Sequence, residues 1–453
     1  MSLVNNTLRV FNRDIIFTLV RLFAGVVVAR VLGPVGIGVW AILDLINNYA
    51  RVFGAPRFEI ASVHFMPKKE YEKGEIIFMT NIIAVVSSII LVIILSFNIG
   101  YLKTVFFKDV TVQSSLMIAT LCYLPILFTN RNYLYFLLSH ENIQSYNMML
   151  IIQDLTKTVL TLILLLYFKL GLWSLTISLL ISGVITMCYG VYKVHQHETI
   201  TRHFNPGLLK NMFNYSYKVY FSEGIGFLTI YLSNLLTAIY LSPISLAFFS
   251  MGKGKAENLN RLTNAVSTVL FPRVSNQNAK EENSDYITSK SFRISIIVLT
   301  IMGGLGTALI YPAVLILYGR EFLPLVKSFW IVILGVIIFS SANILRQYFM
   351  GIGRPDIPLK ISFIPLILQL ALCYWLIPIY GFIGASVAVS ITFFLTGVIT
   401  IAVFKNFTSI SYFEILLPKK ADIILLKDFI KEKIKLLINS IRSVLVTKYK
   451  VTS

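Results

Sequence analysis

The sequence predicts an all-α integral membrane protein of about twelve transmembrane helices, arranged as two parallel six-helix bundles around a central cavity. Three observations predict this fold class. Hydrophobic residues make up 56% of the 453 residues and charged residues only 13%, about half of the 25% that is usual in globular proteins. Apolar runs long enough to cross a bilayer recur along the chain, and motifs of the first half return in the second.

The apolar runs define the elements. A bilayer core about 30 Å thick requires roughly 20 mostly apolar residues in each helix. Because lipid offers no partner to backbone polar groups, we expect every such run to be helical. The predicted spans are 13–33, 37–57, 76–98, 113–138, 146–168, 172–192, 215–240, 244–270, 292–317, 325–349, 359–378 and 382–404.

Lysine and arginine separate the connecting loops into two sets. The richer set contains Arg57, Lys68, Lys69, Lys73, Lys193, Arg202, Lys210, Arg273, Lys280, Lys290, Arg293, Arg354 and Lys360. The poorer set contains Lys103, Lys108, Lys169, Arg320 and Lys327. The positive-inside rule places the richer set in the cytoplasm. Both termini are then cytoplasmic, as an even number of crossings requires.

An internal repeat supports the two bundles. Pro34 and Pro243 lie in similar motifs at an offset of 209, and Gly183-Val-Ile-Thr returns as Gly397-Val-Ile-Thr at an offset of 214. Since six helices per repeat is an even number, both halves enter the membrane from the same side, which is a parallel repeat. The predicted domains are 1–205, 206–405 and a tail of 406–453.

The tail has a different character. In 421–445 the apolar residues recur every three or four positions, which predicts an amphipathic helix. From residue 406 onward, nine Lys and Arg oppose four Asp and Glu, for a net charge of +5. We expect this helix to lie on anionic lipids of the inner leaflet. Packing against the cytoplasmic loops is the alternative.

Polar residues inside the predicted spans indicate a lined cavity, because a charge in hydrocarbon normally faces a bundle interior or water. In the second span, Asp44, Asn47, Asn48 and Arg51 fall at i, i+3, i+4 and i+7, which is one stripe. Arg21 adds a cation in the first span.

The second half carries a similar cluster. In the eighth span, Lys253, Glu257 and Arg261 follow one another at i+4 steps, with Lys255 beside them, and Glu223 lies in the seventh. The uncompensated sign is positive, so the sequence predicts an anionic cargo.

Structural roles are the alternative for several of these charges. Lys253, Glu257 and Arg261 could neutralise one another. Asp154 and Lys157 could form an ion pair, and four arginines could extend to the headgroups. These four are Arg13, Arg30, Arg131 and Arg346.

Other function classes are excluded. Cys122, Cys188 and Cys373 all lie in apolar segments, which excludes a disulfide framework, and no Cys/His spacing indicates a metal site. No catalytic constellation can be argued from spacing, so we expect no enzyme activity and no cofactor. The net charge of +19 is assigned to cytoplasmic loops, lipid headgroups and the cavity, and we expect no nucleic-acid partner.

Several motifs carry a family resemblance. The stretch A-R-V-L-G-P-V-G-I-G-V-W at 29–40 resembles the signature of polysaccharide transporters in the multidrug/oligosaccharidyl-lipid/polysaccharide flippase superfamily. The motifs V-L-F-P-R-V-S (269–275), Y-G-R-E-F (318–322), G-I-G-R (351–354) and I-Y-G-F-I-G-A (379–385) fit the same pattern in the same order.

The resemblance implies a flippase of the bacterial cytoplasmic (inner) membrane. Such proteins move undecaprenyl-diphosphate-linked oligosaccharide from the inner to the outer leaflet for O-antigen, capsule or exopolysaccharide assembly, where polymerase and assembly proteins are expected partners. Their cavity is typically cationic and lined by helices 1, 2, 7 and 8. The expected anion contacts are Arg21, Arg51, Lys253, Lys255 and Arg261. The residues expected to orient these cations, or to couple transport to protons or sodium, are Asp44, Asn47, Asn48, Glu223 and Glu257.

Three alternatives remain at this stage. A drug exporter of the same superfamily would share the fold, but an organic cation favours carboxylates over an excess of arginine and lysine. A lipid II flippase would carry a cationic cavity but two further spanning helices. A membrane glycan polymerase would need catalytic groups on large external loops, whereas the larger loops here are predicted to be cytoplasmic.

Overall fold

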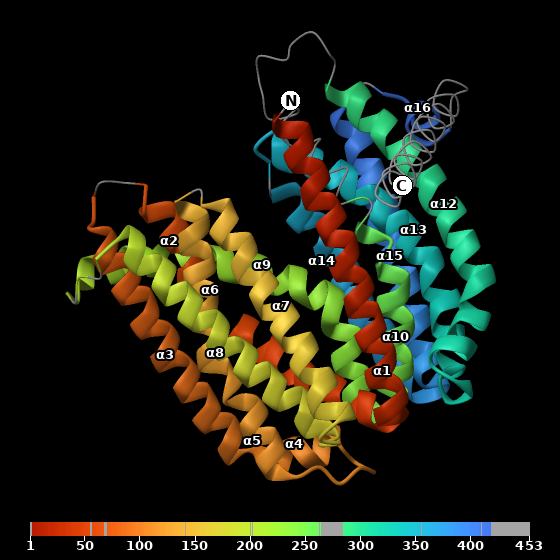
Figure 1. The fold of residues 1–453 in the computed structure, drawn as a ribbon. Helices are drawn as coiled ribbons and strands as arrows, with labels where there is room; N and C mark the ends of the chain where they lie inside the picture. Colours follow the sequence, from red (N-terminus) through yellow and green to blue (C-terminus); the bar gives the residue numbers. More distant parts are fainter. Residues whose placement is uncertain are drawn as a thin grey trace, which may run out of the picture. The chain divides into compact units, whose positions relative to one another are not determined.

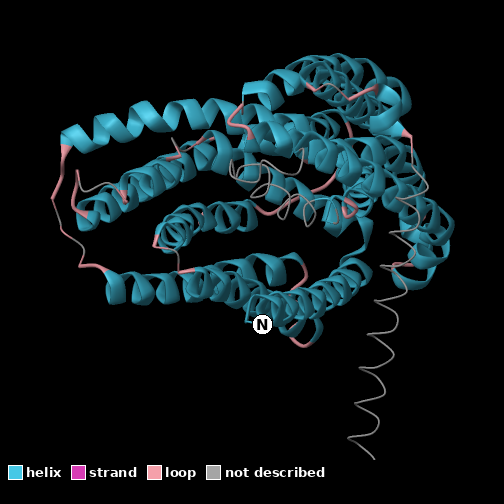
Figure 2. Cartoon of the chain, turned by 90° about the horizontal axis from the view of Figure 1, so that it is seen from above, coloured by secondary structure: helices cyan, strands magenta, loops and turns pink. Residues whose placement is uncertain are grey.

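The computed structural model consists of helices and the loops between them, with no strand in the part of the chain that it describes (Figure 2). The described residues are 2–54, 57–67, 70–140, 142–199, 201, 203–261, 263, 284–354, 356–408 and 410–417. The predicted amphipathic helix at 421–445 and the motif at 269–275 lie outside them.

The helices follow the predicted spans (Figure 1). In the first half they are α1 (Ser2–Phe53), α2 (Phe58–Phe65), α3 (Lys73–Phe97), α4 (Ile99–Phe106), α5 (Ser114–Leu121), α6 (Tyr123–Ser139), α7 (Ile143–Leu166) and α8 (Leu172–His197). In the second half they are α9 (Pro206–Tyr240), α10 (Pro243–Glu257), α12 (Ser284–Leu317), the 3₁₀ turn η1 (Arg320–Phe322), α13 (Pro324–Gly351), α14 (Asp356–Tyr380), α15 (Phe382–Phe407) and α16 (Tyr412–Leu416).

Eight of the described helices are long and apolar enough to cross a membrane. These spans are Val20–Phe53, Lys73–Phe97, Ile143–Leu166, Leu172–His197, Asp285–Leu317, Pro324–Gly351, Asp356–Tyr380 and Phe382–Phe407. The other predicted spans are helical where they are described, in α5, α6, α9 and α10. The chain is therefore an all-α, multi-pass membrane protein, as the sequence predicts.

The first two predicted spans are joined without a loop. Both belong to α1, and the junction is Gly33, whose φ of 64° and ψ of −179° interrupt the helical backbone. Pro34 follows, and its missing N–H is tolerated because it stands in the first turn of the second segment. Glycine adopts the positive φ without a Cβ clash. The kink thus lies at the junction of the predicted spans 13–33 and 37–57.

The predicted span 113–138 is interrupted. It consists of α5 and α6, which meet at Cys122. Pro125 lies in the first turn of α6 and has no N–H to donate to the carbonyl of Leu121, and its ring crowds that carbonyl. A single uninterrupted helix over 113–138 is therefore a wrong prediction, and the reason is this proline.

By their internal contacts, the residues form two compact units. The first contains Met1–Gly252, Ile310–Ser328 and Leu366–Ala388. The second contains Lys253–Leu309, Phe329–Pro365 and Val389–Ser453. The domain boundaries at 205 and 405 stay predictions.

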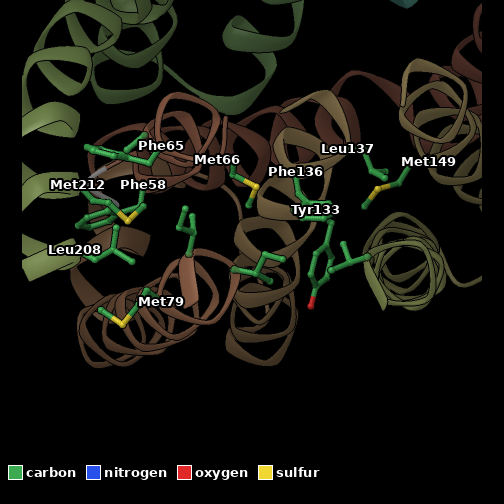
Figure 3. Close-up of a cluster of buried hydrophobic side chains, with 14 residues drawn as sticks. Phe58, Phe65, Met66, Met79, Tyr133, Phe136, Leu137, Met149, Leu208 and Met212 are labelled. Atoms are coloured by element: carbon green, nitrogen blue, oxygen red, sulfur yellow. The ribbon is translucent and has the colours of Figure 1, made fainter. Parts of the chain in front are cut away.

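A core in the first unit holds the short helix α2 among longer helices. Phe58 and Phe65 of α2 pack in one buried cluster with Met79 of α3, Phe136 of α6 and Met212 of α9 (Figure 3). The packing of α2 against α6 and α9 fixes the residues at both ends of α2. This matters because charged side chains flank the cluster.

The second unit has a smaller core. Phe292 of α12, Phe349 of α13 and Phe404 of α15 are fully buried, and Ile415 of α16 packs on them. The guanidinium of Arg293, which is 1% exposed, donates to the backbone carbonyl of α16 at Glu414. This bond attaches α16 to the core.

The repeat-related prolines occupy equivalent positions. Pro243 is the first residue of α10, just as Pro34 begins the second segment of α1. The two segments touch: a Cβ on Gly38 would overlap the backbone carbonyl of Pro243. Gly384 is equally confined by the carbonyl of Leu376. Small residues thus let backbones approach closely.

Candidate functional site

The polar stripe of α1 forms a chain of hydrogen bonds. Asn48 Nδ2 donates to the backbone carbonyl and to Oδ2 of Asp44, both at 2.9 Å. Arg51 Nη2 donates to Asn48 Oδ1 at 3.3 Å. These three residues therefore share one face, as their spacing predicts. Asn47 turns toward α5, where its Nδ2 donates to the carbonyl of Thr120 at 3.3 Å.

A buried carboxylate, Glu59, lies next to this stripe. Its Oε1 accepts from Arg131 Nη2 at 3.1 Å and from Arg131 Nε at 3.2 Å, and it lies 3.3 Å from Arg57 Nη1. Arg57 also forms an ion pair with Glu223 of α9. Glu59 thus connects α2 to α6, and Arg57 connects α2 to α9.

The backbone at Arg57 is unusual. Arg57 has a φ of 59°, a left-handed conformation that is uncommon for residues other than glycine, and it is the residue before the first turn of α2. Its side chain is only 4% exposed. This conformation, together with the core below α2, directs the guanidinium between the two carboxylates.

A small cavity separates the stripe from this carboxylate. Its volume is about 20 Å³, room for about one water molecule. Its polar walls come from Arg51, Glu59 and Arg131 together with side chains of α3 and α6. The lining residues are Arg51, Phe58, Glu59, Thr80, Ile83, Ala84, Ser87, Phe128, Arg131 and Asn132.

Cations exceed carboxylates by one in this part of the first unit. Arg51 lies within electrostatic range of Arg131, Glu59 and Asp44, and Lys157 acts on Asp44 in the same way. The four cations and three carboxylates of this network are Arg51, Arg57, Arg131, Lys157, Asp44, Glu59 and Glu223.

Arg21 binds a carboxylate for which the sequence suggested another partner, Lys157. Its guanidinium forms an ion pair with Asp154 of α7. Asp154 is therefore paired with Arg21, and the ammonium of Lys157 lies 5.9 Å from the centre of the Trp40 ring. The alternative of a pair between Asp154 and Lys157 is wrong in this structure, because α7 packs against α1.

Three arginines that could extend to headgroups have acceptors within the protein. Arg131 binds Glu59, as described. Arg30 Nε donates to the carbonyl of Leu317 at 2.7 Å, at the last residue of α12. Arg346 Nη2 donates to Ser362 Oγ at 3.2 Å. Extension to headgroups is wrong for Arg131 and Arg346, because both are half-buried and bind protein acceptors. For Arg30, which is exposed, it stays a prediction. The side chain of Arg13 is outside the described part.

The cations of the second unit are placed on and after α10. Lys253 is 2% exposed, and its Nζ lies 3.7 Å from Glu257 Oε1. Lys255 is half-buried on the same helix, and Arg261 is exposed. The regular i+4 stripe ends at Glu257, where α10 ends and a turn follows. The sequence Glu-Asn-Leu-Asn explains this end, since asparagine favours turns over helix interiors.

Sequence reasoning missed Glu59 and the inward role of Arg57 and Arg131. The motif F-E-I-A-S-V-H-F at 58–65 contains a single carboxylate among apolar residues. A lone carboxylate in an apolar segment indicates a buried partner of opposite charge, and this signal could have found Glu59.

Two known sequences are similar to this chain. The chain is 22% identical over 405 residues to the "Putative O-antigen transporter" of Shigella flexneri, covering 86% of this chain and 95% of that protein. It is 25% identical over 244 residues to the "Probable low-salt glycan biosynthesis flippase Agl15" of Haloferax volcanii, covering 53% of this chain. The chain spans 50% of the length of this second relative.

Solved structures share the fold. The lipid II flippase MurJ in an inward closed conformation superimposes with a TM-score of 0.69 at 16% identity, covering 86% of this chain and 87% of that one. An inward-facing multidrug resistance transporter of the MATE family, in the MOP superfamily, also gives 0.69, at 14% identity, covering 87% and 94%.

The model of one family matches most of the sequence. Its description is "Polysaccharide biosynthesis protein", and the match covers residues 27–327. This range includes α1 to α13 in part, and with them both clusters of charge described above. The chain therefore belongs to the polysaccharide biosynthesis protein family, with the helical fold of the MOP transporters.

Proposed function

We propose that this protein is a flippase that moves a polyprenyl-diphosphate-linked oligosaccharide across the cytoplasmic membrane, from the inner to the outer leaflet. The observation that carries this proposal is the arginine network of Arg51, Arg57 and Arg131 inside a multi-pass membrane protein. Family membership and a transporter fold agree with it. The role is transport of an intact lipid-linked glycan, with no catalysis.

Physical chemistry connects the network to this cargo. A diphosphate cannot enter hydrocarbon without replacement of its hydration. Guanidinium groups supply paired N–H donors that match phosphate oxygens and keep their charge at any physiological pH. Arg51 donates to a neutral amide, Asn48, and this leaves its charge for a phosphate to neutralise.

Alternating access provides the mechanism. In this hypothesis the glycan and diphosphate occupy a hydrated cavity while the lipid chain stays in an apolar environment, and the two halves rock to expose the cavity to each side in turn. For Lys253, Lys255 and Arg261 of the second unit, a role in anion binding stays a prediction from the sequence. Both termini are cytoplasmic, and the basic tail binds anionic lipids. Polymerase and assembly proteins receive the cargo outside.

Coupling to protons or sodium is assigned to Asp44. Glu223 and Glu257 each contact a cation, Arg57 and Lys253 respectively. Asp44 accepts its hydrogen bond from the neutral amide of Asn48. A carboxylate with a neutral partner can exchange a proton or cation without breaking an ion pair, so Asp44 suits this role best.

Reconstituted transport tests the proposal. Proteoliposomes containing a fluorescent polyprenyl-diphosphate oligosaccharide report transfer between leaflets when an external quencher is added. We expect Arg51→Gln to slow transfer at least about tenfold, because a hydrogen bond to a charged group contributes about 1.5–3 kcal/mol. Lys193→Gln, at a half-buried lysine of α8 whose Nζ donates to Gln196 of the same helix, is the matched control and should transfer normally.

Three results would contradict the proposal. Equal transfer in vesicles with the wild-type protein and in protein-free vesicles would show that the protein has no flippase activity. Export of organic cations that depends on Asp44 and tolerates Arg51→Gln would instead assign the drug-exporter function of the MATE relatives. Transfer of lipid II alone would identify the peptidoglycan precursor as the cargo.

A further inference from the structure

An apolar pocket lies in the first unit, apart from the arginine network. Its volume is about 280 Å³. Four helices, α1, α3, α4 and α9, supply its walls, and every lining side chain is aliphatic or aromatic, with a glycine completing the surface. The lining residues are Leu45, Ile46, Tyr49, Ala50, Phe53, Gly54, Leu91, Leu95, Leu102, Phe106 and Leu235.

The volume of the pocket and the apolar character of its lining indicate that a hydrocarbon chain occupies it. An apolar cavity of about 150 Å³ stays dry and takes up benzene. By that scale, 280 Å³ accommodates about ten carbons, or about two isoprene units. The polar atoms that would hold several waters are absent among its lining residues, apart from the hydroxyl of Tyr49.

The pocket and the cationic cavity follow one another along a single face of α3. Thr80, Ala84 and Ser87 line the cationic cavity, and Leu91 and Leu95 line the apolar pocket. Successive intervals of 4, 3, 4 and 4 residues keep these side chains on one stripe. Ser87 and Leu91 are separated by about 6 Å along the axis, at 1.5 Å per residue.

The order of these two sites matches an amphiphile. Arg51 and Arg131 mark the charged end, which along α3 lies nearer to Lys73, a residue that the positive-inside rule places in the cytoplasm. The apolar pocket follows along α3, away from its first residue, Lys73. A lipid of the inner leaflet has the same polarity, with its phosphate at the cytoplasmic surface and its chain deeper.

We propose that the apolar pocket binds the phosphate-proximal isoprene units of a polyprenyl phosphate or diphosphate, whose phosphate contacts Arg51 and Arg131. This inference rests on the proposed function and specifies where the lipid part of its cargo is recognised. The cavity of about 20 Å³ admits one phosphate oxygen, while the rest of the phosphate lies at its mouth. Charge complementarity at one end selects this lipid over an uncharged one.

Photo-crosslinking tests the site. A photoreactive phenylalanine analogue replaces Leu95, inside the pocket, or Ile93, which is 49% exposed on the same helix and serves as the matched control. The full-length protein is placed in phosphatidylcholine nanodiscs with radiolabelled undecaprenyl phosphate. We expect crosslinking at 95 that excess unlabelled undecaprenyl phosphate abolishes, and weaker crosslinking at 93 that does not respond.

A second set of measurements tests the contact between the lipid phosphate and Arg51. Arg51→Gln should reduce crosslinking at 95 about tenfold, because one charged hydrogen bond contributes about that factor. The uncharged alcohol undecaprenol should not compete. Equal competition by undecaprenol or by phosphatidylglycerol would overturn the proposal, since the pocket would then accept any lipid chain. No crosslinking at 95 would also overturn it.

A transport measurement separates this inference from the proposed function. Leu95→Trp fills the pocket, and Ile93→Trp places the same ring on the exposed face. We expect Leu95→Trp to slow transfer of lipid-linked oligosaccharide and Ile93→Trp to leave the transfer rate unchanged. Both variants should elute at the wild-type position in size-exclusion chromatography. Normal transfer by Leu95→Trp would refute the pocket while the flippase function stands. Loss of transfer in the wild type itself would refute the function instead.

Discussion

Substitution of Glu59 by glutamine tests the central ion network. The carboxylate is 9% exposed and holds Arg131, which is 19% exposed, and Arg57, which is 4% exposed. Removing one partner of a buried ion pair costs about 3–5 kcal/mol, because the other charge remains buried. Glutamine keeps one carbonyl oxygen for Arg131, so we expect the lower end, about 3 kcal/mol.

Thiol labelling during denaturation measures this loss. Cys373 is 0% exposed, whereas Cys122 and Cys188 are exposed. In a Cys122→Ser, Cys188→Ser background, a maleimide dye therefore reacts at Cys373 only when the protein unfolds. Labelling against denaturant concentration, in detergent at pH 7, gives the free energy of unfolding for each variant.

A second bridging carboxylate supplies the control. Glu198 accepts from Lys73 Nζ at 2.7 Å and contacts His140 Nε2 at 3.3 Å, but Lys73 is 43% exposed. Exposed pairs contribute about 0.2–1 kcal/mol, so Glu198→Gln should lower stability by less than about 1 kcal/mol. Equal losses for Glu59→Gln and Glu198→Gln would refute the reasoning, because burial would then have no effect.

Three further predictions concern packing, capping and pH. Gly38→Ala should destabilise the protein by about 1–3 kcal/mol, because the new methyl overlaps the backbone of Pro243; the same denaturation assay checks it. Arg30→Gln should cost about 1 kcal/mol, by removing a charged cap from the end of α12, and should increase amide exchange there. Burial raises the pKa of Glu198, but hydrogen bonds from Lys73 and His140 outweigh it and hold the pKa below its usual value. The stability lost in Glu198→Gln should therefore be present above the ordinary pKa of a glutamate and disappear as the pH falls through that lowered pKa; pH titration of both proteins measures it.

The helices could be predicted because their cause is local. Composition and span length determine that a run such as α3 or α15 is helical in lipid. The polar stripe of α1 could also be predicted, since spacing alone brings Asp44, Asn48 and Arg51 to one face. The bonds from Arg51 to Asn48 and from Asn48 to Asp44 follow directly from that spacing.

The partners of the charges could not be predicted, because they depend on which helices pack together. Arg21 and Asp154 are separated by 133 residues, and Arg131 and Glu59 by 72. No periodicity relates such positions. Arg57 stands in a loop of the cytoplasmic set, yet the left-handed backbone at this residue turns it inward. Its burial arises from the core under α2, which forms only in the folded chain.

The near balance of charge in the network is consistent with transport. A carrier must bind its cargo well enough to admit it and weakly enough to release it, a requirement that also governs conduction through pores. Three uncompensated arginines in a site of low dielectric would hold a diphosphate strongly. Glu59 and Glu223 already occupy part of the donor capacity of Arg131 and Arg57, so under the proposed function an arriving phosphate would exchange with carboxylates and gain only the difference. Under the proposed function, the carboxylates keep the arginines oriented between transport cycles, and the remaining positive charge favours an anionic cargo.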